Sequence, residues 1–367
     1  MAPSDEMSRS HSRDSSGSPD VIVDANVLGR QRTGDETHVR EILSCLGRDS
    51  ADLRIAAVAR QAELVPEGIA GLELVPLNQA ARMLWQMPRL LRRERTRLAH
   101  FQYVVPPLYR GRAVVTIHDL SYELLPELED RFDGWALRRL VPPSVRRAER
   151  VLTVSEWTKR DIVRRYDVPE EKVVVTLNGV GREFRPEGPV PSRPGYVLFV
   201  GALRPRKDPL GALAAFADLE DLGLELVMVG PDKGLLGRVR SAIDRLGIAG
   251  RVELRGHVGI DELAALYRGA DCVVLPSLYE GFGLPVVEAM ASGTPVVATS
   301  VGAVPEIAGD AAVLVPPRDP IALSEGVRSA LARREQLVAA GLERALRFTW
   351  EEVARRTASV YRDLLAA

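Results

Sequence analysis

The chain has 367 residues, 46% hydrophobic and 27% charged, a size and composition that predict a soluble globular protein of two or three domains. Its formal net charge of −1 gives no general attraction to nucleic acid, so no nucleic-acid partner is expected. Its two cysteines provide no disulfide framework and no apolar run reaches a membrane-spanning length, so we expect a cytoplasmic protein.

Residues 1–19 are rich in Ser, Arg and Asp, and they are predicted to form a disordered tail and not a signal peptide. After them, short apolar runs alternate with helical patterns, which is typical of parallel α/β sheets. Two doubly wound domains are expected, over residues 20–184 and 196–349. The four prolines and two glycines of residues 185–195 predict a linker between them. Strands are expected at residues 21–24, 53–58, 72–75, 113–117, 151–154, 173–176, 196–200, 224–229, 252–254, 272–275, 296–298 and 312–315.

Three segments of the first predicted domain carry candidate functional residues. Gly34 stands in a loop before a helix that is predicted to begin near residue 36. Residues 82–97 hold six arginines and a tryptophan, and they form either a basic amphipathic helix on an anionic membrane or a solvated helix face. His118 and Asp119 end the apolar run 113–117, and ligands of such sheets bind at the carboxyl ends of the strands. A core histidine satisfied by backbone groups is the alternative for His118.

Arg206 and Lys207 follow the first strand of the second predicted domain. Two cations at a strand end could neutralise a diphosphate leaving group, on which charge grows as a glycosidic bond breaks. An exposed basic turn is the alternative. No Asp-x-Asp occurs in the chain and its five histidines are scattered, so neither a metal ion nor another cofactor is expected.

The segment 276–288 is the most informative part of the chain. It places Glu280 and Glu288 on either side of a glycine loop and the start of a predicted helix. Gly281 and Gly283 would let the backbone approach a ligand closely, and a helix start offers N–H groups to a phosphate. The two carboxylates would accept hydrogen bonds from hydroxyl groups, so together these features suit a nucleotide-sugar. On spacing alone, a surface turn with two solvated glutamates is an equal alternative.

The run Glu280-Gly-Phe-Gly-Leu-Pro and the run Glu288-Ala-Met-Ala-Ser-Gly-Thr-Pro resemble the donor-site signature of retaining glycosyltransferases of family 4 (glycosyl transferases group 1). The resemblance extends over roughly residues 21–362. It implies an α/β protein with the GT-B fold, in which two Rossmann-like doubly wound domains face a central cleft. It also implies that a last helix, 350–367, crosses back onto the first domain.

The resemblance also implies roles for the residues named above. Glu280 would bind sugar hydroxyl groups, Glu288 the ribose diol, and His118 the sugar or the acceptor. Glu306 is expected to cap or brace its own loop. The predicted catalytic residues are His118, Glu280, Arg206 and Lys207, and the predicted donor-binding residues are Gly281, Phe282, Gly283, Leu284, Glu288, Val258 and Gly34.

The predicted function is transfer of a hexose from a nucleoside diphosphate sugar to a hydroxyl group of a glycan or lipid-linked acceptor, with retention. The Pro205-Arg206-Lys207 sequence makes GDP-mannose the first donor to consider. Surface glycan, polysaccharide or glycolipid synthesis is the expected role, with peripheral contact at the inner face of the membrane through 82–97 if the acceptor is lipid-linked. A sugar-nucleotide epimerase or phosphorylase on the same architecture, and a non-catalytic sugar-nucleotide-binding protein, are the alternatives.

Overall fold

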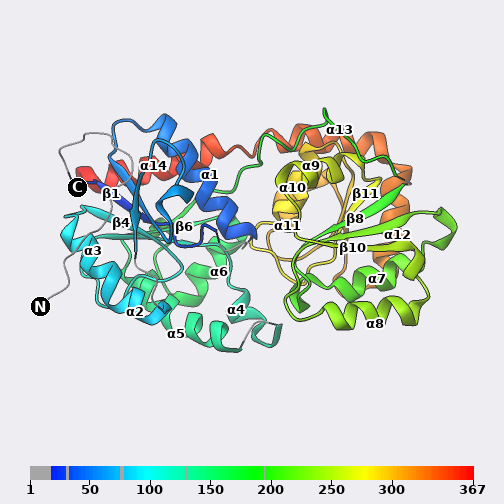
Figure 1. Cartoon of the computed structure of the whole chain (residues 1–367), viewed down its shortest axis with the longest axis horizontal. Helices are drawn as coiled ribbons and strands as arrows, with labels where there is room; N and C mark the ends of the chain where they lie inside the picture. The colour runs from blue at the N-terminus through cyan, green and yellow to red at the C-terminus, as the bar shows by residue number, and fades with distance from the viewer. Residues whose placement is uncertain (1–17, 30–32, 75–77, 129–130, 194) are drawn as a thin grey trace, which may run out of the picture.

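The computed structural model describes residues 18–29, 33–74, 78–128, 131–193 and 195–367. Most of the predicted tail, residues 1–17, and residue 194 of the predicted linker lie outside the described residues. The chain forms two lobes that lie side by side, each built on a parallel β-sheet with helices on its two faces (Figure 1).

The first lobe holds a seven-stranded parallel sheet with the strand order β3-β2-β1-β4-β5-β6-β7. From β1 the chain adds strands toward one edge of the sheet as far as β3, and from β4 it adds strands toward the other edge. Between β1 and β4 the carboxyl ends of the strands form the usual ligand crevice of a doubly wound sheet. One strand, β4, was not predicted. The strands are β1 Val21–Asp24, β2 Ile55–Ala59, β3 Ala70–Glu73, β4 Leu98–Gln102, β5 Ala113–Ile117, β6 Arg150–Thr153 and β7 Val173–Val175.

The second lobe holds a six-stranded parallel sheet with the strand order β10-β9-β8-β11-β12-β13. The chain adds strands toward one edge from β8 and toward the other edge from β11, so the loops that follow these two strands border the crevice. The strands are β8 Tyr196–Val200, β9 Glu225–Val229, β10 Val252–Gly256, β11 Cys272–Leu275, β12 Val296–Thr299 and β13 Val313–Val315.

The helices alternate with the strands along the chain. Ser155, Asp208 and Thr349 cap the starts of α6, α7 and α14, because each side chain accepts a hydrogen bond from a backbone N–H of the first turn. The helices are α1 Thr33–Asp49, α2 Gln79–Ala81, α3 Met87–Arg93, α4 Ser121–Leu124, α5 Arg131–Arg147, α6 Glu156–Tyr166, α7 Pro209–Ala217, α8 Leu236–Leu246, α9 Ile260–Gly269, α10 Leu284–Ala291, α11 Val304–Ala308, α12 Pro320–Ala332, α13 Arg334–Ala345 and α14 Trp350–Ala366.

Each sheet separates two apolar clusters, and the last helix contributes to one of those in the first lobe. Trp350 and Tyr361 of α14 are buried together with Val21, Leu43 and Leu98. The helix therefore lies against α1 and the first sheet, although it follows the second lobe in the chain (Figure 1).

The basic segment 82–97 differs from a single amphipathic helix. A π-helical turn, Arg82–Gln86, runs into α3, and α3 ends at Arg93. Arg82 points inward, where its Nη1 lies 2.9 Å from an oxygen of the buried Asp24. One of the six arginines is therefore a structural ion partner and not part of a solvent-facing stripe.

Candidate active site

The predicted site residues meet where loops of the two lobes touch. Ser155, which follows β6, donates a hydrogen bond from Oγ to the carbonyl oxygen of Gly281, which follows β11, at 2.7 Å. Nη1 of Arg206, after β8, lies 3.8 Å from Oδ2 of Asp119, after β5. A Cβ atom placed on Gly281 would lie 2.1 Å from the carbonyl oxygen of His118. The structure therefore brings the carboxyl ends of both sheets into direct contact.

Glu280 is buried at this junction, with two cations around it. Lys207 Nζ donates a hydrogen bond to Glu280 Oε1, and Ser277 Oγ donates to the same oxygen at 2.6 Å. Arg206 Nη1 lies 3.8 Å from Glu280 Oε2. Burial by itself would raise the pKa of the Glu280 carboxyl, but Lys207, Arg206 and Ser277 together hold it below its ordinary value. Glu280 is therefore ionised at neutral pH.

Burial and neighbouring charges also shift the pKa values of Lys207 and Asp119. Burial lowers the pKa of the Lys207 ammonium, and the nearby Glu280 carboxylate opposes that effect. Burial opposes the ionisation of Asp119, but Arg206 and the hydrogen bonds from Ser121 lower the pKa of Asp119 below its ordinary value. The result is an alternation of charges across the two lobes, in which the buried Glu280 and the partly buried Asp119 are carboxylates and the partly buried Arg206 and Lys207 are cations.

Backbone contacts hold the loop around Glu280 in place. Leu278 N–H donates to the Arg206 carbonyl at 2.8 Å, and Arg206 Nη1 donates to the Tyr279 carbonyl at 2.9 Å. The loop after β12 lies on its other side, where Ala303 N–H donates to the Glu280 carbonyl at 2.9 Å. Gly302 allows this approach, because its φ is +54° and a Cβ would lie 2.2 Å from that carbonyl oxygen.

His118 is a buried, neutral histidine. Its Nε2 lies 2.9 Å from Oε1 of Gln102, at the end of β4, so Nε2 donates and Nδ1 remains the acceptor. Burial lowers the pKa of His118 to about 4. The ring of His38 lies 4.6 Å away in an edge-to-face contact, and His38 Nδ1 lies 2.6 Å from Asn178 Oδ1. Gln102, His38 and Asn178 were not predicted as site residues, since no spacing along the chain connects them.

Glu288 occupies the second turn of α10. The helix begins after Gly283, whose φ of +93° suits glycine, and Pro285 lies in its first turn, where a missing N–H costs nothing. Tyr267 of α9 donates a hydrogen bond from Oη to Glu288 Oε2 at 2.7 Å. Burial raises the pKa of Glu288 to about 7, although Tyr267 and Lys207 act against that rise. Glu288 thus changes charge near neutral pH.

The remaining predicted donor-binding residues lie around this centre in different ways. Gly34 of α1 faces Leu284 of α10, since a Cβ on Gly34 would lie 4.0 Å from Leu284 Cδ1. The side chain of Phe282 is buried between the lobes with Val154 and Phe348, so only its backbone can contact a donor. Val258 follows β10 and packs on the core of the second lobe.

Glu306 has a different role from the one predicted. Its carboxylate oxygens Oε1 and Oε2 accept hydrogen bonds from the backbone N–H groups of Glu156 and Trp157, each at 2.9 Å. These are exposed donors in the first turn of α6, which belongs to the other lobe. A side chain of the second lobe therefore caps a helix of the first.

The residues that the structure describes offer no candidate for a metal centre or a membrane span. Within the described ranges, no group of three or more His, Cys, Asp or Glu side chains is arranged to hold a metal ion. Across the same ranges, none of the helices has the length and apolar character needed to cross a bilayer.

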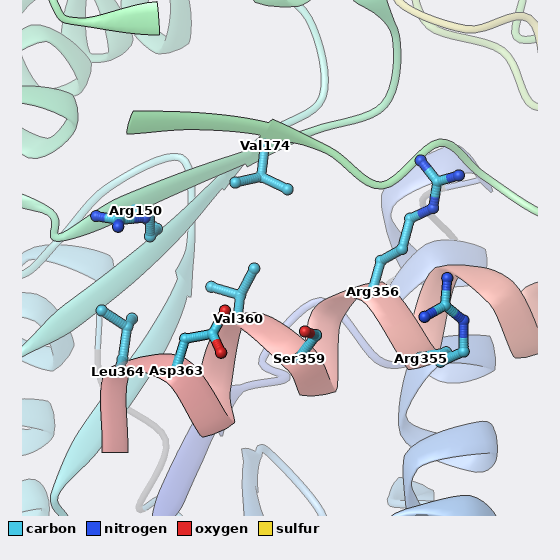
Figure 2. A pocket seen from close by; sticks show the side chains of 8 residues that line it. All are labelled: Arg150, Val174, Arg355, Arg356, Ser359, Val360, Asp363 and Leu364. Atoms are coloured by element: carbon cyan, nitrogen blue, oxygen red, sulfur yellow. The ribbon is translucent and has the colours of Figure 1, made fainter. Parts of the chain in front are cut away.

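A cavity of about 250 Å³ lies outside the junction, between α14 and the β6–β7 edge of the first sheet. Figure 2 shows Arg355, Ser359 and Asp363 on the helix side, with Arg150 and Val174 across from them. No predicted site residue lines this cavity, so it does not form part of the candidate site.

Comparisons with known proteins identify the family of the chain. The model of the family "Glycosyl transferases group 1" matches residues 181–344, and that of "Glycosyltransferase Family 4" matches residues 32–184. O-antigen chain mannosyltransferase B from Escherichia coli is 31% identical over 269 residues, which cover 69% of this chain and 71% of the relative. MMP α-(1→4)-mannosyltransferase from Mycolicibacterium hassiacum is 37% identical over 234 residues, which cover 60% of this chain and 56% of that enzyme.

Among solved structures, sucrose-phosphate synthase from Thermosynechococcus elongatus superposes with a TM-score of 0.78 at 21% identity. The superposition covers 94% of this chain and 98% of the synthase, which shows that the fold of both lobes is shared. The chain therefore belongs to the glycosyltransferases of family 4 (glycosyl transferases group 1), and it is a glycosyltransferase with the GT-B fold.

Proposed function

We propose that this glycosyltransferase moves a hexose from a nucleoside diphosphate sugar to a hydroxyl group of a glycan or lipid-linked acceptor, with retention of the α-configuration. The observation that carries the proposal is the pair of partly buried cations, Arg206 and Lys207, gathered around the buried Glu280 where the two lobes touch. A partly buried cation pair next to a glycine loop and a helix start suits a diphosphate.

In this proposal a donor diphosphate shares the two cations with Glu280. Arg206 offers a planar guanidinium to phosphate oxygens and Lys207 a compact positive charge. Both stabilise the negative charge that develops on the departing phosphate, so they lower the barrier to bond breaking. Backbone N–H groups at the start of α10, near Gly283 and Leu284, provide further donors.

The transfer step follows from the protonation states of the site. The bond between the anomeric carbon and the diphosphate oxygen breaks, and the acceptor oxygen forms its bond on the same face of the sugar. The acceptor proton passes to the departing phosphate oxygen. His118 is neutral near pH 7 because burial lowers its pKa, and its Nδ1 accepts a hydrogen bond from a hydroxyl group, so it orients the sugar or acceptor and need not be the base.

Glu280 is ionised and rigidly held, so it accepts hydrogen bonds from sugar hydroxyl groups and stabilises positive charge on the sugar ring. Glu288 accepts hydrogen bonds from the two hydroxyl groups of the ribose. The preferred route is reaction on one face through an oxocarbenium-like state. The other route to the same stereochemistry is two displacements: Glu280 attacks the anomeric carbon as the diphosphate leaves, and the acceptor oxygen then displaces Glu280. This proposal includes no metal ion, because Arg206 and Lys207 supply positive charge beside the leaving group.

Mannose is the proposed sugar, and GDP-mannose the proposed donor. Two relatives, from Escherichia coli and Mycolicibacterium hassiacum, are named mannosyltransferases, which supports this choice. The test is to incubate the protein with an equimolar panel of GDP-mannose, UDP-glucose, UDP-galactose and ADP-glucose plus candidate acceptors. Acceptor-dependent release of GDP above the other diphosphates supports the proposal, and release of none of them contradicts it.

We also propose that the first lobe contacts an anionic membrane surface. Trp85 of the π-helical turn is 58% exposed, and the guanidinium of Arg89 in α3 lies 5.8 Å from the centre of its ring. On α5, Trp135 is 57% exposed and Arg139 lies one turn away. The two helices bury their apolar sides in the same core cluster, so both cover one face of the sheet.

Paired tryptophans and arginines suit the boundary between lipid headgroups and acyl chains. Flotation with vesicles that contain phosphatidylglycerol tests this surface, with the double variant Trp85→Ser/Trp135→Ser as comparison. Binding that the double variant loses supports the proposal. No binding of the unaltered protein at low salt contradicts it and favours a soluble acceptor.

A further inference from the structure

A partly buried hydrogen bond between Tyr267 and Glu288 joins the predicted ribose site to the body of the second lobe. Tyr267 is fully buried in α9, and its Oη donates to Glu288 Oε2 at 2.7 Å. Burial and the carboxylate acceptor together hold the pKa of this tyrosine well above its ordinary value, so its hydroxyl stays protonated and can only donate this bond.

Tyr267 is itself held by one contact to its ring and one to its backbone. Phe184, which precedes the predicted linker, packs edge to face on it with ring centres 5.5 Å apart. Thr294, just after α10, donates from Oγ1 to the Tyr267 carbonyl at 2.6 Å. The hydroxyl therefore has a fixed position, and a fixed donor restricts the rotation of the carboxylate that accepts from it.

We propose that Tyr267 is a positioning residue for the donor nucleotide, which holds the Glu288 carboxylate so that its remaining acceptor positions face the vicinal hydroxyl groups of the ribose. This inference rests on the proposed function, because it assumes that Glu288 accepts the ribose diol. Tyr267 contacts no part of the donor, and it acts through Glu288 alone.

The charge of Glu288 makes the inference measurable. An ionised carboxylate accepts from both hydroxyl groups of a diol, whereas a protonated one has fewer acceptor positions. Burial raises the pKa of Glu288 to about 7; Tyr267 and Lys207 lower it, and Glu183 raises it. Loss of the tyrosine hydroxyl removes a hydrogen bond that favours the ionised form, so the pKa rises further and diol binding requires a higher pH.

The test measures nucleotide affinity by calorimetry from about pH 6 to about pH 9. The probes are GDP and UDP, each compared with its 2′,3′-dideoxy form, which has the same phosphates but no diol. The variant is Tyr267→Phe. Its control is Tyr196→Phe, which also removes a buried hydroxyl that donates to α9, in this case to the Leu266 carbonyl at 2.7 Å, without touching Glu288.

For the unaltered protein we expect the ribonucleotide to bind more tightly than the dideoxy form above neutral pH, with the preference fading as pH falls through about 7. In Tyr267→Phe the midpoint moves upward by about one pH unit, and affinity at neutral pH falls about tenfold. Tyr196→Phe leaves the midpoint unchanged. On a Glu288→Gln background, Tyr267→Phe causes no additional loss of affinity.

The possible outcomes distinguish failure of the proposed function from failure of the Tyr267 role. If the unaltered protein binds ribo and dideoxy forms equally across the range, the ribose role of Glu288 fails, and the proposed function fails at that residue. If the ribo preference exists but Tyr267→Phe shows the same midpoint as the unaltered protein, only the role of Tyr267 fails. A full additional loss from Tyr267→Phe on the Glu288→Gln background also overturns it, because the tyrosine would then act independently of the carboxylate.

Discussion

Replacing Gly281 with alanine should separate the two lobes where the loop after β11 meets the loop after β5. The new Cβ would lie 2.1 Å from the His118 carbonyl oxygen and 2.7 Å from Asp119 Cβ. Non-bonded carbon atoms rest about 3.5–4.0 Å apart, so the two loops must separate by about 1 Å. Gly281 is not among the residues of positive φ, so alanine fits its backbone and the effect falls on the contact between lobes.

The consequences differ for catalysis and for stability. A displacement of about 1 Å at a reacting centre costs about a hundredfold in rate, so we expect Gly281→Ala to lower the transfer rate by about that factor. Each sheet keeps its own core, and the contact loses the hydrogen bond from Ser155 to the Gly281 carbonyl, a change of about 1 kcal/mol. The melting temperature should therefore change little.

The assay compares sugar transfer, nucleotide affinity and melting temperature for Gly281→Ala and for Gly237→Ala. Gly237 is the matched control, because it lies in α8 with nothing within 4 Å of an added Cβ. Wild-type transfer rates in Gly281→Ala would refute the idea that this contact belongs to the reactive arrangement. A large fall in melting temperature would also contradict it, because the loss of transfer would then reflect unfolding.

The same contacts support three further predictions. Lys207→Ala should weaken nucleotide-sugar binding by about 1.5–3 kcal/mol in calorimetry, because a charge-assisted contact is lost, and unchanged affinity would contradict the phosphate role. Glu306→Ala should lower the transfer rate about tenfold and leave the pH profile of nucleotide affinity unchanged, because only the cap on α6 is lost. In solution scattering with nucleotide bound, the variant should have a larger radius of gyration than the unaltered protein. An equal radius would show that the cap does not hold the lobes together. Activity should persist in EDTA, and loss that magnesium restores would show that the cations do not suffice.

The sequence predicted the elements that carry strong local signals. The glycines and proline around Glu280 predicted a strand, loop and helix, and the structure has β11, the loop and α10 at those positions. The predicted last helix is likewise present as α14, which begins after its cap residue Thr349. Local chemistry determines such elements, since cap residues and a first-turn proline act within one turn of helix.

Other features depend on contacts between distant segments. β4 was missed because its five residues follow an arginine-rich helix and include a histidine, His100. His100 is buried, and its ring nitrogens are hydrogen-bonded to Tyr361 and Thr116, which are distant in the sequence. Tyr267 looks like an ordinary core position of α9, and nothing in its own segment indicates Glu288. Partners 140 residues apart, such as His38 and Asn178, likewise have no signature in spacing.

Glu306 illustrates the same limit between lobes. The family resemblance suggested that the carboxylate caps or braces its own loop. Its partners are instead backbone N–H groups of α6, and the identity of such partners depends on how two domains dock. A sequence pattern that describes one domain contains no information about that docking.

The configuration of the new glycosidic bond bears most directly on the proposed reaction. The unaltered protein is mixed with GDP-mannose and an acceptor alcohol, and the anomeric signal of the first product is followed by NMR before any slow equilibration. We expect an α-linked mannoside that forms in step with GDP release, and a much slower appearance of the same product with the Gly281→Ala protein. A β-linked product would contradict retention, and GDP release without any glycoside would contradict transfer.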